Sequence, residues 1–436
     1  MAAPNEQPAD PAPARSLSAV LPPLVLGTAT FNTQYVADPS SMPYAAIVAR
    51  ALDLGIAAFD TSPYYGPSEL LLGDALRSIN PSRESLFLVS KAGRVGPTEF
   101  DYSPSWIRYS VLRSLKRLGT THLDLVYTHD AEFVPPADVL GAVSELRRLR
   151  DEGLVRYVGI SGYPVDQLCQ LAELVLRKTG EPLDAVMSYC HCSIQNGVLV
   201  KGFDQETGGV SSRDAPATAA YPLSRFREAG VSVVLNASML GMGLLTTRGV
   251  DNGPQAAWHP SPPLLRKACA SAAAAATRAG KKLESIAIRY ALDTFARAGA
   301  EAGLGVQLPG VSMTVGPSVI GVSSIDELEE TWRVWQSVLH GLSLGREKPR
   351  DGWPQHGDRG SEKNGPHALS LEQRDEVRKL VRETIWPLLG EWRDYSWMSP
   401  EEGFVNSRQQ MGVMPADSDV MAEYETLKEK QARSLS

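Results

Sequence analysis

The chain contains few cysteines, shows no excess of basic residues and lacks long hydrophobic runs. Cysteine occurs at only four of the 436 positions, Cys169, Cys190, Cys192 and Cys269, and this spacing fits neither a disulfide framework nor paired zinc knuckles. We therefore expect a reducing compartment and a cytoplasmic location.

The charge and the hydropathy argue against two classes of partner. The net charge is −7, and the 43 Lys and Arg residues are scattered, unlike the clustered basic residues of nucleic-acid-binding proteins. No apolar stretch approaches the roughly 20 residues that span a bilayer. We expect a small-molecule ligand, and neither a nucleic acid nor a membrane as partner.

The N-terminal segment differs in composition from the rest of the chain. Residues 1–20 are rich in proline and alanine and carry charges of both signs. They contain no continuous apolar core of the kind found in secretory signals. The composition predicts a disordered lead.

Short apolar runs alternate with helical patterns after this lead. Each run and the helix that follows take about 30 residues, the size of a βαβ unit. Eight such units close into a (β/α)8 TIM barrel, which we expect over residues 21–343. An open doubly wound sheet is the alternative, and the number of runs favours the barrel. The runs are residues 24–30, 57–60, 86–91, 123–129, 155–161, 185–189, 231–237 and 318–324.

Several segments exceed what a barrel requires. Residues 200–222 and 296–317 are rich in glycine, alanine and proline and predict excursions between units. After the barrel we expect a polar linker over residues 344–370, a C-terminal helical extension over 371–404 and a flexible tail over 405–436. The apolar side chains of the extension need a surface, and the barrel body or its mouth is the obvious one.

Four chemically active residues lie at or after the ends of consecutive predicted strands. Asp60, Lys91 and His129 end the second, third and fourth runs, and Tyr65 follows the second. In a (β/α)8 barrel these ends converge on one site. Each residue alone also has an ordinary structural interpretation, but together they predict a site that handles protons.

A tyrosine needs help to exchange protons near neutral pH, because its ordinary pKa is about 10. An ammonium group nearby favours the phenolate, so we expect Lys91 to lower the pKa of Tyr65. Asp60 would fix Lys91 in place. His129 would orient the substrate oxygen or relay the proton, since histidine ordinarily titrates near physiological pH.

The chain resembles the aldo-keto reductases over residues 22–340. The stretch "DTSPYYGPSELLLG" matches the D-T-x3-Y-G-x-S-E-x2-L-G pattern of that family at every specified position. The stretches "SPSWIRYSVLRSLKRLGTTHLDLVYTH", "VRYVGIS" and "SVIGVSSIDELEE" also look like family segments. The resemblance implies a nicotinamide-dependent enzyme with a tetrad of Asp60, Tyr65, Lys91 and His129, in which Tyr65 donates or accepts the proton.

The departures from the family pattern lie in the segments that the resemblance assigns to the cofactor. Only Ser161 of the usual Ser-Asn pair is retained, Val186 replaces the usual Gln with Ser188 nearby, and Ala237 replaces the usual stacking aromatic. This combination looks like the branch of L-galactose and D-arabinose 1-dehydrogenases. The resemblance implies oxidation of the anomeric hydroxyl of an aldose to a lactone, with Ser161 and Ser188 in the cofactor site.

The resemblance also bears on the choice of cofactor. Relatives that bind the 2′-phosphate of NADP place a Lys and an Arg where this chain has Gly321 and Glu327. A carboxylate there repels a phosphate, which favours NAD, with NADP as the alternative. Ser324 and Glu327 also form a capping-box pattern, a compatible structural role for Glu327.

Further contacts to the cofactor are expected around the last helix. The backbone amides of Val322, Ser323 and Ser324 lie at a predicted helix start, where phosphate oxygens bind readily. Glu330 occupies the position that contacts adenosine in the family. We therefore place all four in the cofactor site.

Candidate substrate contacts are Tyr64, Phe31 and His191. His191 lies in "CHC" at residues 190–192, where strand alternation would put the two cysteines on one face and the histidine on the other. No second pair of ligands accompanies them, so we predict no metal site. Each of the three candidates also fits a packing role.

Two other functions remain open at this point. An NADPH-dependent carbonyl reductase would use the same tetrad. A non-enzymatic, cofactor-binding regulatory subunit would need the fold without the chemistry, and the intact tetrad argues against it.

Overall fold

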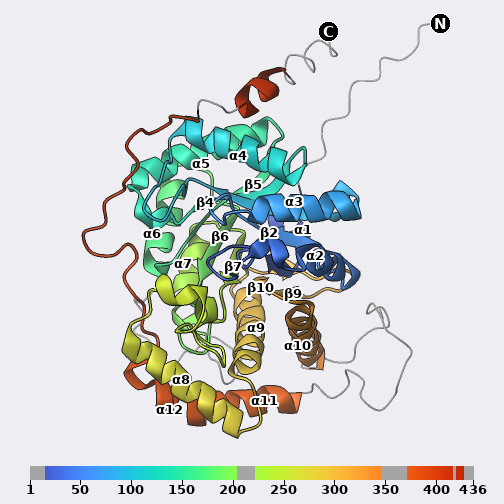
Figure 1. Ribbon diagram of the computed structural model, residues 1–436, viewed down its shortest axis with the longest axis vertical. Coiled ribbons are helices and arrows are strands. Elements are labelled where there is room, and N and C mark those ends of the chain that lie inside the picture. Colours follow the sequence, from blue (N-terminus) through green and yellow to red (C-terminus); the bar gives the residue numbers. More distant parts are fainter. Residues whose placement is uncertain (1–14, 204–220, 345–370, 416–418, 427–436) are drawn as a thin grey trace, which may run out of the picture.

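The computed structural model describes residues 15–203, 221–344, 371–415 and 419–426. Eight parallel strands close into a barrel in the order β1-β10-β7-β6-β5-β4-β3-β2 (Figure 1). The predicted TIM barrel is therefore confirmed, and the open doubly wound sheet is wrong. Each of the eight predicted runs forms a barrel strand. These are β1 (Leu24–Gly27), β2 (Ala58–Asp60), β3 (Phe87–Ala92), β4 (Leu123–His129), β5 (Val155–Gly162), β6 (Ala185–Tyr189), β7 (Val233–Ala237) and β10 (Ser318–Gly321).

Helices surround the barrel because each presents one apolar stripe to the strands. In α4 the residues Ile107, Val111, Leu115 and Leu118 recur at helical spacing, and all four are buried. The helix then ends at Gly119, whose left-handed φ of 67° suits glycine. The surrounding helices are α2 (Tyr44–Asp53), α3 (Ser68–Ile79), α4 (Pro104–Leu118), α5 (Pro136–Asp151), α6 (Val165–Thr179), α7 (Pro222–Glu228), α9 (Leu283–Glu301) and α10 (Ile325–Leu344), with α8 (Pro263–Arg278) added between β7 and α9.

The N-terminal boundary of the fold differs from the prediction. Residues Leu17–Val20 form the short helix α1, and Leu17 is 1% exposed. The predicted disordered lead is therefore wrong for these residues, because one buried leucine anchors them. Residues 1–14 lie outside the described part of the chain.

The two predicted excursions have different outcomes. Most of residues 200–222 lie outside the described residues. In residues 296–317, helix α9 continues to Glu301, and the rest includes an antiparallel pair, β8 (Val306–Gln307) and β9 (Thr314–Val315). The second excursion is therefore shorter than predicted, because its alanines extend the helix.

The C-terminal extension begins with α11 (Leu371–Leu380), continues through residues 381–385 and ends in α12 (Trp386–Leu389). Its buried side chains Val381, Ile385 and Leu389 belong to one apolar cluster with residues of α8 and α9. Figure 1 shows these helices together at one end of the molecule. The helical part therefore covers the added helix α8 as well as α9, and the predicted linker lies almost wholly outside the described residues.

Beyond α12 the chain is extended and follows the rim of the barrel. Residues 392–412 contact in turn the segments after β6, β5, β4 and β3. Figure 1 shows this segment passing α6 toward α4 and α5. We call residues 392–412 the rim segment.

The predicted flexible tail is wrong for its described residues. The side-chain amide of Asn406 donates to Phe100 O at 2.7 Å and accepts from Phe100 N at 3.0 Å. Farther on, residues 420–426 are helical, and Lys116 of α4 forms an ion pair with Asp419 at 2.9 Å. Val420, Met421 and Tyr424 also pack against the apolar core, so both polar and apolar contacts hold this segment.

Candidate active site

The structure brings the four predicted tetrad residues together at one end of the barrel. Lys91 of β3 donates from Nζ to Asp60 Oδ1 of β2 at 2.6 Å and to Thr61 O at 2.9 Å. The ammonium lies 4.8 Å from the centroid of the Tyr65 ring, and the His129 ring lies 5.5 Å from that ring, nearly perpendicular to it. The strand ends thus place an acid, an amine, a phenol and an imidazole around one point.

The expected effect of Lys91 on Tyr65 is wrong for the structure as it stands. Burial of the hydroxyl, followed by the negative charges of Asp60 and Asp130, raises the pKa of Tyr65 well above its ordinary value. Lys91 is paired with Asp60, whose charge offsets the attraction of the ammonium for a phenolate. Tyr65 is therefore a protonated phenol at neutral pH.

His129 is neutral instead of titrating near physiological pH. Burial, with the nearby charges of Lys91 and Arg94, lowers the pKa of His129 to about 3, and Asp130 only partly opposes this shift. The neutral ring favours the first of the two expected roles of His129, orienting a substrate oxygen, over the second, relaying a proton. A neutral ring still orients a substrate oxygen if one of its nitrogens carries a hydrogen.

Ser62 determines which nitrogen of His129 carries that hydrogen. The Ser62 hydroxyl accepts from Tyr64 N at 3.1 Å and lies 3.0 Å from His129 Nδ1. Tyr64 N uses one lone pair of this hydroxyl, and among the described residues His129 Nδ1 is the acceptor within reach of its hydrogen, so we assign that hydrogen to Nδ1. Nε2 then bears the imidazole hydrogen and is the donor available to a substrate.

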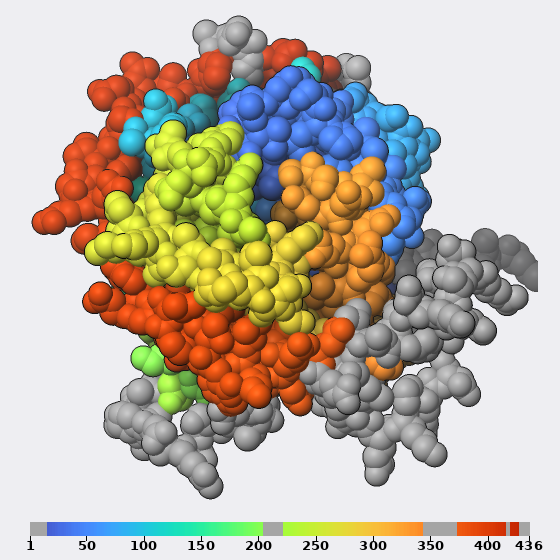
Figure 2. All heavy atoms as spheres, turned by 60° about the horizontal axis from the view of Figure 1, so that its bottom comes forward, coloured from blue at the N-terminus to red at the C-terminus, as the bar shows by residue number. Residues whose placement is uncertain are grey.

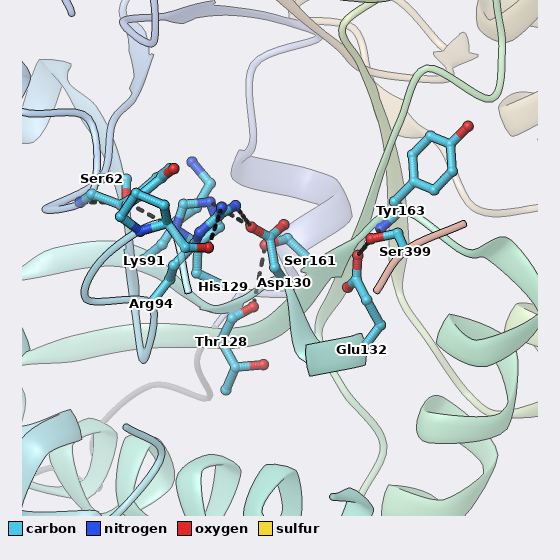
Figure 3. A network of polar contacts seen from close by, with 12 residues as sticks. Ser62, Lys91, Arg94, Thr128, His129, Asp130, Glu132, Ser161, Tyr163 and Ser399 are labelled. Atoms are coloured by element: carbon cyan, nitrogen blue, oxygen red, sulfur yellow. Dashed lines mark hydrogen bonds and ion pairs between the residues drawn. The ribbon is translucent and has the colours of Figure 1, made fainter. Parts of the chain in front are cut away.

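An ion pair that the sequence analysis missed lies beside this ring. Arg94, which follows β3, donates to Asp130, which follows His129 directly (Figure 3). Asp130 Oδ2 is 3.7 Å from His129 Nε2, and the Arg94 guanidinium lies 3.9 Å from the centroid of the Tyr64 ring. In a (β/α)8 barrel, residues just after the strand ends also lie near the site. Their positions after β3 and β4 could therefore have pointed to Arg94 and Asp130.

A buried carboxyl group links the site to the rim segment. Glu132 Oε1 accepts from Tyr163 N and from Ser399 Oγ, each at 3.0 Å (Figure 3). Trp397 stacks on Tyr163 with ring centroids 4.7 Å apart. Burial and the charge of Asp130 raise the pKa of Glu132 to about 8, so this group is protonated at neutral pH. No sequence signal joins residues more than 230 positions apart.

Polar side chains predicted for the cofactor lie on neighbouring strands. Ser161 of β5 donates to Thr128 O at 3.2 Å, and Ser188 of β6 lies 3.4 Å from His191 Nδ1. Ser188 pairs in register with Asn236 of β7, which the sequence analysis missed. Among the described residues, the buried Oδ1 of Asn236 has no hydrogen-bond partner, so it is an acceptor left for an amide donor.

The start of α10 has the predicted cap with one difference. Ser324 Oγ accepts from Glu327 N at 3.2 Å, as in a capping box. The Glu327 carboxylate accepts from the amide of Ser323 at 2.7 Å and from its hydroxyl. The Ser323 amide is therefore occupied and is not free for a phosphate. Val322 O accepts from Thr30 Oγ1, which ties this turn to the segment after β1.

The neighbouring positions differ in how accessible they are. Gly321 is exposed at the end of β10, and a Cβ there would meet only a methyl group of Thr30, at 3.4 Å. Glu330 accepts from Ser285 Oγ at 2.5 Å and from Lys282 at 3.4 Å. The Ser285 hydrogen bond, with the Lys282 charge, lowers the pKa of Glu330. Its carboxylate is thus held by α9.

Of the three predicted substrate contacts, Tyr64 lies near the tetrad, whereas Phe31 and His191 pack elsewhere. Tyr64 lies edge-on to His129, with centroids 5.7 Å apart. Phe31 is fully buried in the core against Tyr44. His191 is 1% exposed, lies against Tyr163 and has Ser188 and Ser396 beside its two nitrogens. Phe31 and His191 therefore have packing roles, because neither presents a free group.

The alternation argument for "CHC" is wrong, because β6 ends at Tyr189 and Cys190 has a φ of 68°. Both cysteines there are buried. Within the described ranges, no group of three His, Cys, Asp or Glu side chains is arranged to hold a metal ion.

The open end of the barrel forms a hollow. Figure 2 shows it bordered by blue residues from the N-terminal part, yellow-green residues that follow β7 and orange residues near α10. These are the segments that carry the Gly321 turn and the loop after β7.

The Aldo/keto reductase family model matches residues 23–341. The chain belongs to this family. As an aldo/keto reductase it is assigned to an oxidoreductase family. No helix in the described ranges is both long enough and apolar enough for a membrane span.

This aldo/keto reductase is similar to two characterised sugar dehydrogenases. It is 38% identical over 311 residues to D-arabinose 1-dehydrogenase of Saccharomyces cerevisiae, covering 70% of this chain and 81% of that protein. It is 30% identical over 288 residues to L-galactose dehydrogenase of Arabidopsis thaliana, covering 65% and 75%. A putative aldo-keto reductase from Pseudomonas aeruginosa covers 73% of this chain with a TM-score of 0.44 at 22% identity.

We predict that Ser62→Ala disturbs the orientation of His129. Without the hydroxyl, Nδ1 loses its donor and the ring loses its preferred tautomer. We expect kcat to fall by about 3- to 10-fold, the value of one hydrogen bond, with KM changing less. Nitrogen NMR of the imidazole would show a shift of the hydrogen away from Nε2.

The control is Ser114→Ala, which removes a buried serine that bonds only within α4. It should leave both kcat and the imidazole spectrum unchanged. An unchanged His129 tautomer in Ser62→Ala would contradict the assignment.

We predict that Glu132→Gln removes a pH-dependent loss of stability. The pKa of Glu132 is about 8 in the folded protein, above its ordinary value of 4.5. The stabilising contribution of the protonated group is therefore complete below about pH 4.5 and is lost progressively as the pH rises to about 8. The free energy of unfolding of the native protein should fall relative to Glu132→Gln by at most about 1.4 kcal/mol per pH unit in that window. Urea unfolding at pH 5, 6.5 and 8 measures the difference.

Ser399→Ala is the matched control, because it removes a donor to Glu132 without removing a titratable group. Its effect on stability should vary much less with pH. A pH-independent difference between the native protein and Glu132→Gln would show that Glu132 is ionised in the fold.

Proposed function

We propose that this protein oxidises the anomeric hydroxyl of an aldose of the D-arabinose or L-galactose type to the lactone, with NAD as the hydride acceptor. The observation that carries the proposal is the cluster of Tyr65, Lys91 and His129 around one point at the barrel end. The two dehydrogenases to which the chain is similar support the substrate class.

The side chains divide the work of moving one proton. His129 donates a hydrogen bond from Nε2 to the anomeric oxygen and aligns that oxygen with the side-chain oxygen of Tyr65. Tyr65 acts as the general base that takes the hydroxyl proton. Lys91, fixed by Asp60, stabilises the phenolate before transfer. When bound, the nicotinamide ring accepts the hydride from the anomeric carbon.

The described residues fit a nicotinamide dinucleotide. Ser161, Ser188 and the unpartnered Asn236 Oδ1 offer hydrogen-bonding groups to a carboxamide. Val322 and Ser324 lie at the start of α10, where backbone amides favour phosphate oxygens. Gly321 and Glu327 remain candidate neighbours of the cofactor because of their places at the start of this helix, whereas the Ser323 amide is taken by Glu327 and the Glu330 carboxylate by Ser285.

The geometry around Glu327 supports NAD over NADP. Its carboxylate is held at the first turn of α10 by Ser323, so a negative charge is fixed at the position where relatives that bind the 2′-phosphate carry a cation, and that phosphate adds about −1.5 to −2 charge. Gly321 supplies no cation there.

The protonated state of Tyr65 favours the alternative function, an NADPH-dependent carbonyl reductase. A phenol with a raised pKa is suited to donate a proton to a carbonyl oxygen. Comparing aldose oxidation by NAD with aldehyde reduction by NADPH distinguishes the two.

We predict that the native protein oxidises at least one pentose or hexose with NAD, and that Tyr65→Phe lowers kcat by about 10²- to 10⁴-fold. Because Tyr65 must lose its proton before it accepts another, the rate of oxidation should rise with pH. A dehydrogenase screen over aldoses with both cofactors, followed by pH profiles, measures this.

Tyr65→Phe should bind NAD nearly as tightly as the native protein in a fluorescence titration. Tyr44→Phe, which removes a surface hydroxyl bonded to Asp74, is the matched control and should turn over normally. Absence of aldose oxidation with either cofactor, or retention of most activity by Tyr65→Phe, would contradict the proposal.

We predict that Glu327→Gln improves the use of NADP relative to NAD. The amide still accepts from Ser323, so the cap is kept while the charge is removed. Adding Gly321→Lys should increase the preference for NADP further, by about 10-fold or more in the ratio of kcat/KM values.

Glu329→Gln is the control for this pair, because it removes a charge on the same helix that is ion-paired with Arg50. It should leave the cofactor ratio unchanged. An unchanged ratio in the double variant would show that the 2′-position is read elsewhere.

A further inference from the structure

We propose that the Arg94–Asp130 ion pair binds a hydroxyl group of the substrate other than the anomeric one, and so makes the site selective for polyhydroxylated substrates. This inference rests on the proposed function and names two residues that determine specificity.

The pair lies directly beside the reacting position. Asp130 follows His129 in the chain, and its Oδ2 is 3.7 Å from the Nε2 that bonds the anomeric oxygen. Arg94 approaches from the segment after β3, and its guanidinium covers the ring of Tyr64. Arg94, His129 and Asp130 lie side by side (Figure 3), so a sugar held by His129 would have its neighbouring hydroxyls within reach of this pair.

Asp130 accepts fewer hydrogen bonds than Asp124, a structural carboxylate at the other end of β4. Asp124, at the opposite end of β4, accepts from Leu88 N, Arg83 and Arg156. Among the described residues, Asp130 accepts a hydrogen bond only from Arg94. Its carboxylate thus keeps lone pairs available, although its side chain is 3% exposed.

The backbone at Asp130 also argues against a purely structural role. Its φ of 56° lies in the left-handed region, which costs a non-glycine residue on the order of 1 kcal/mol or more. Buried ion pairs add little net stability, since desolvation offsets their attraction. A strained residue that forms such a pair beside a reacting group is typical of a functional position.

A carboxylate next to a guanidinium matches the chemistry of a sugar hydroxyl. A hydroxyl both donates and accepts, so it can give its hydrogen to Asp130 while accepting one from Arg94. Hydrogen bonds to charged groups are stronger than those between neutral groups. A substrate that lacks the hydroxyl leaves Asp130 and Arg94 without these bonds and therefore binds less tightly. A simple aldehyde or monohydric alcohol has no second hydroxyl to offer and gains nothing from the pair.

The test combines removal of one substrate hydroxyl with removal of the Asp130 charge. The native protein and Asp130→Asn are assayed with an aldose and with its monodeoxy analogues, each lacking one hydroxyl other than the anomeric one. For at least one position, the deoxy sugar should lower kcat/KM of the native protein by about 10-fold or more. In Asp130→Asn, kcat/KM for the same deoxy sugar should be less than about 3-fold below kcat/KM for the parent aldose. We call this ratio the deoxy penalty.

Arg94→Gln is the second variant and should reduce the same deoxy penalty, which keeps the test informative if Asp130→Asn folds poorly. Asp124→Asn is the matched control at the other end of β4 and should lower stability while leaving every deoxy penalty as in the native protein. NAD titration and thermal unfolding accompany each variant.

The outcomes separate this inference from the proposed function. Equal deoxy penalties in the native protein and in both variants, at every position, overturn the role of the pair while aldose oxidation stands. If the native protein oxidises no aldose, the proposed function falls and the inference falls with it.

Discussion

The candidate site depends on the buried ion pair between Lys91 and Asp60. Both side chains are almost inaccessible to solvent, and Asp60 Oδ2 has no partner among the described residues. Such incomplete pairing is costly, so stability alone does not explain it. The pair does fix an ammonium 4.8 Å from the Tyr65 ring, and only adjacent barrel strands hold it there, since Asp60 and Lys91 end β2 and β3.

The rim segment gives the loops around this pair a shared support. It contacts Tyr163 after β5, Glu132 after β4 and Phe100 after β3, so three loops of the barrel are hydrogen-bonded to one continuous segment. Loops gain precision when their backbone groups are bonded to another element. The extension therefore stabilises the positions of Asp130 and Arg94 through their immediate neighbours, without contributing a reacting group itself.

The sequence predicted the barrel and all eight strands, and it predicted that Asp60, Tyr65, Lys91 and His129 lie together, because period, length and strand-end position are local properties. It did not predict the charge states. Tyr65 and His129 respond to burial and to Asp130, which only the folded arrangement brings near them. The rim segment was missed for a related reason: its contacts come from single residues, such as the amide of Asn406 and the rings of Trp397 and Phe404, and these form no periodic apolar pattern in the sequence.

The charges at the site balance, and this balance explains why the phenol is protonated. Asp60 pairs with Lys91, Asp130 pairs with Arg94, and His129 is neutral, so burial dominates the pKa of Tyr65. A positive charge brought to the strand ends upsets that balance and favours the phenolate. The oxidised nicotinamide ring carries such a charge and its reduced form does not. Under the proposed function, the same tyrosine would accept a proton during oxidation and donate one during reduction.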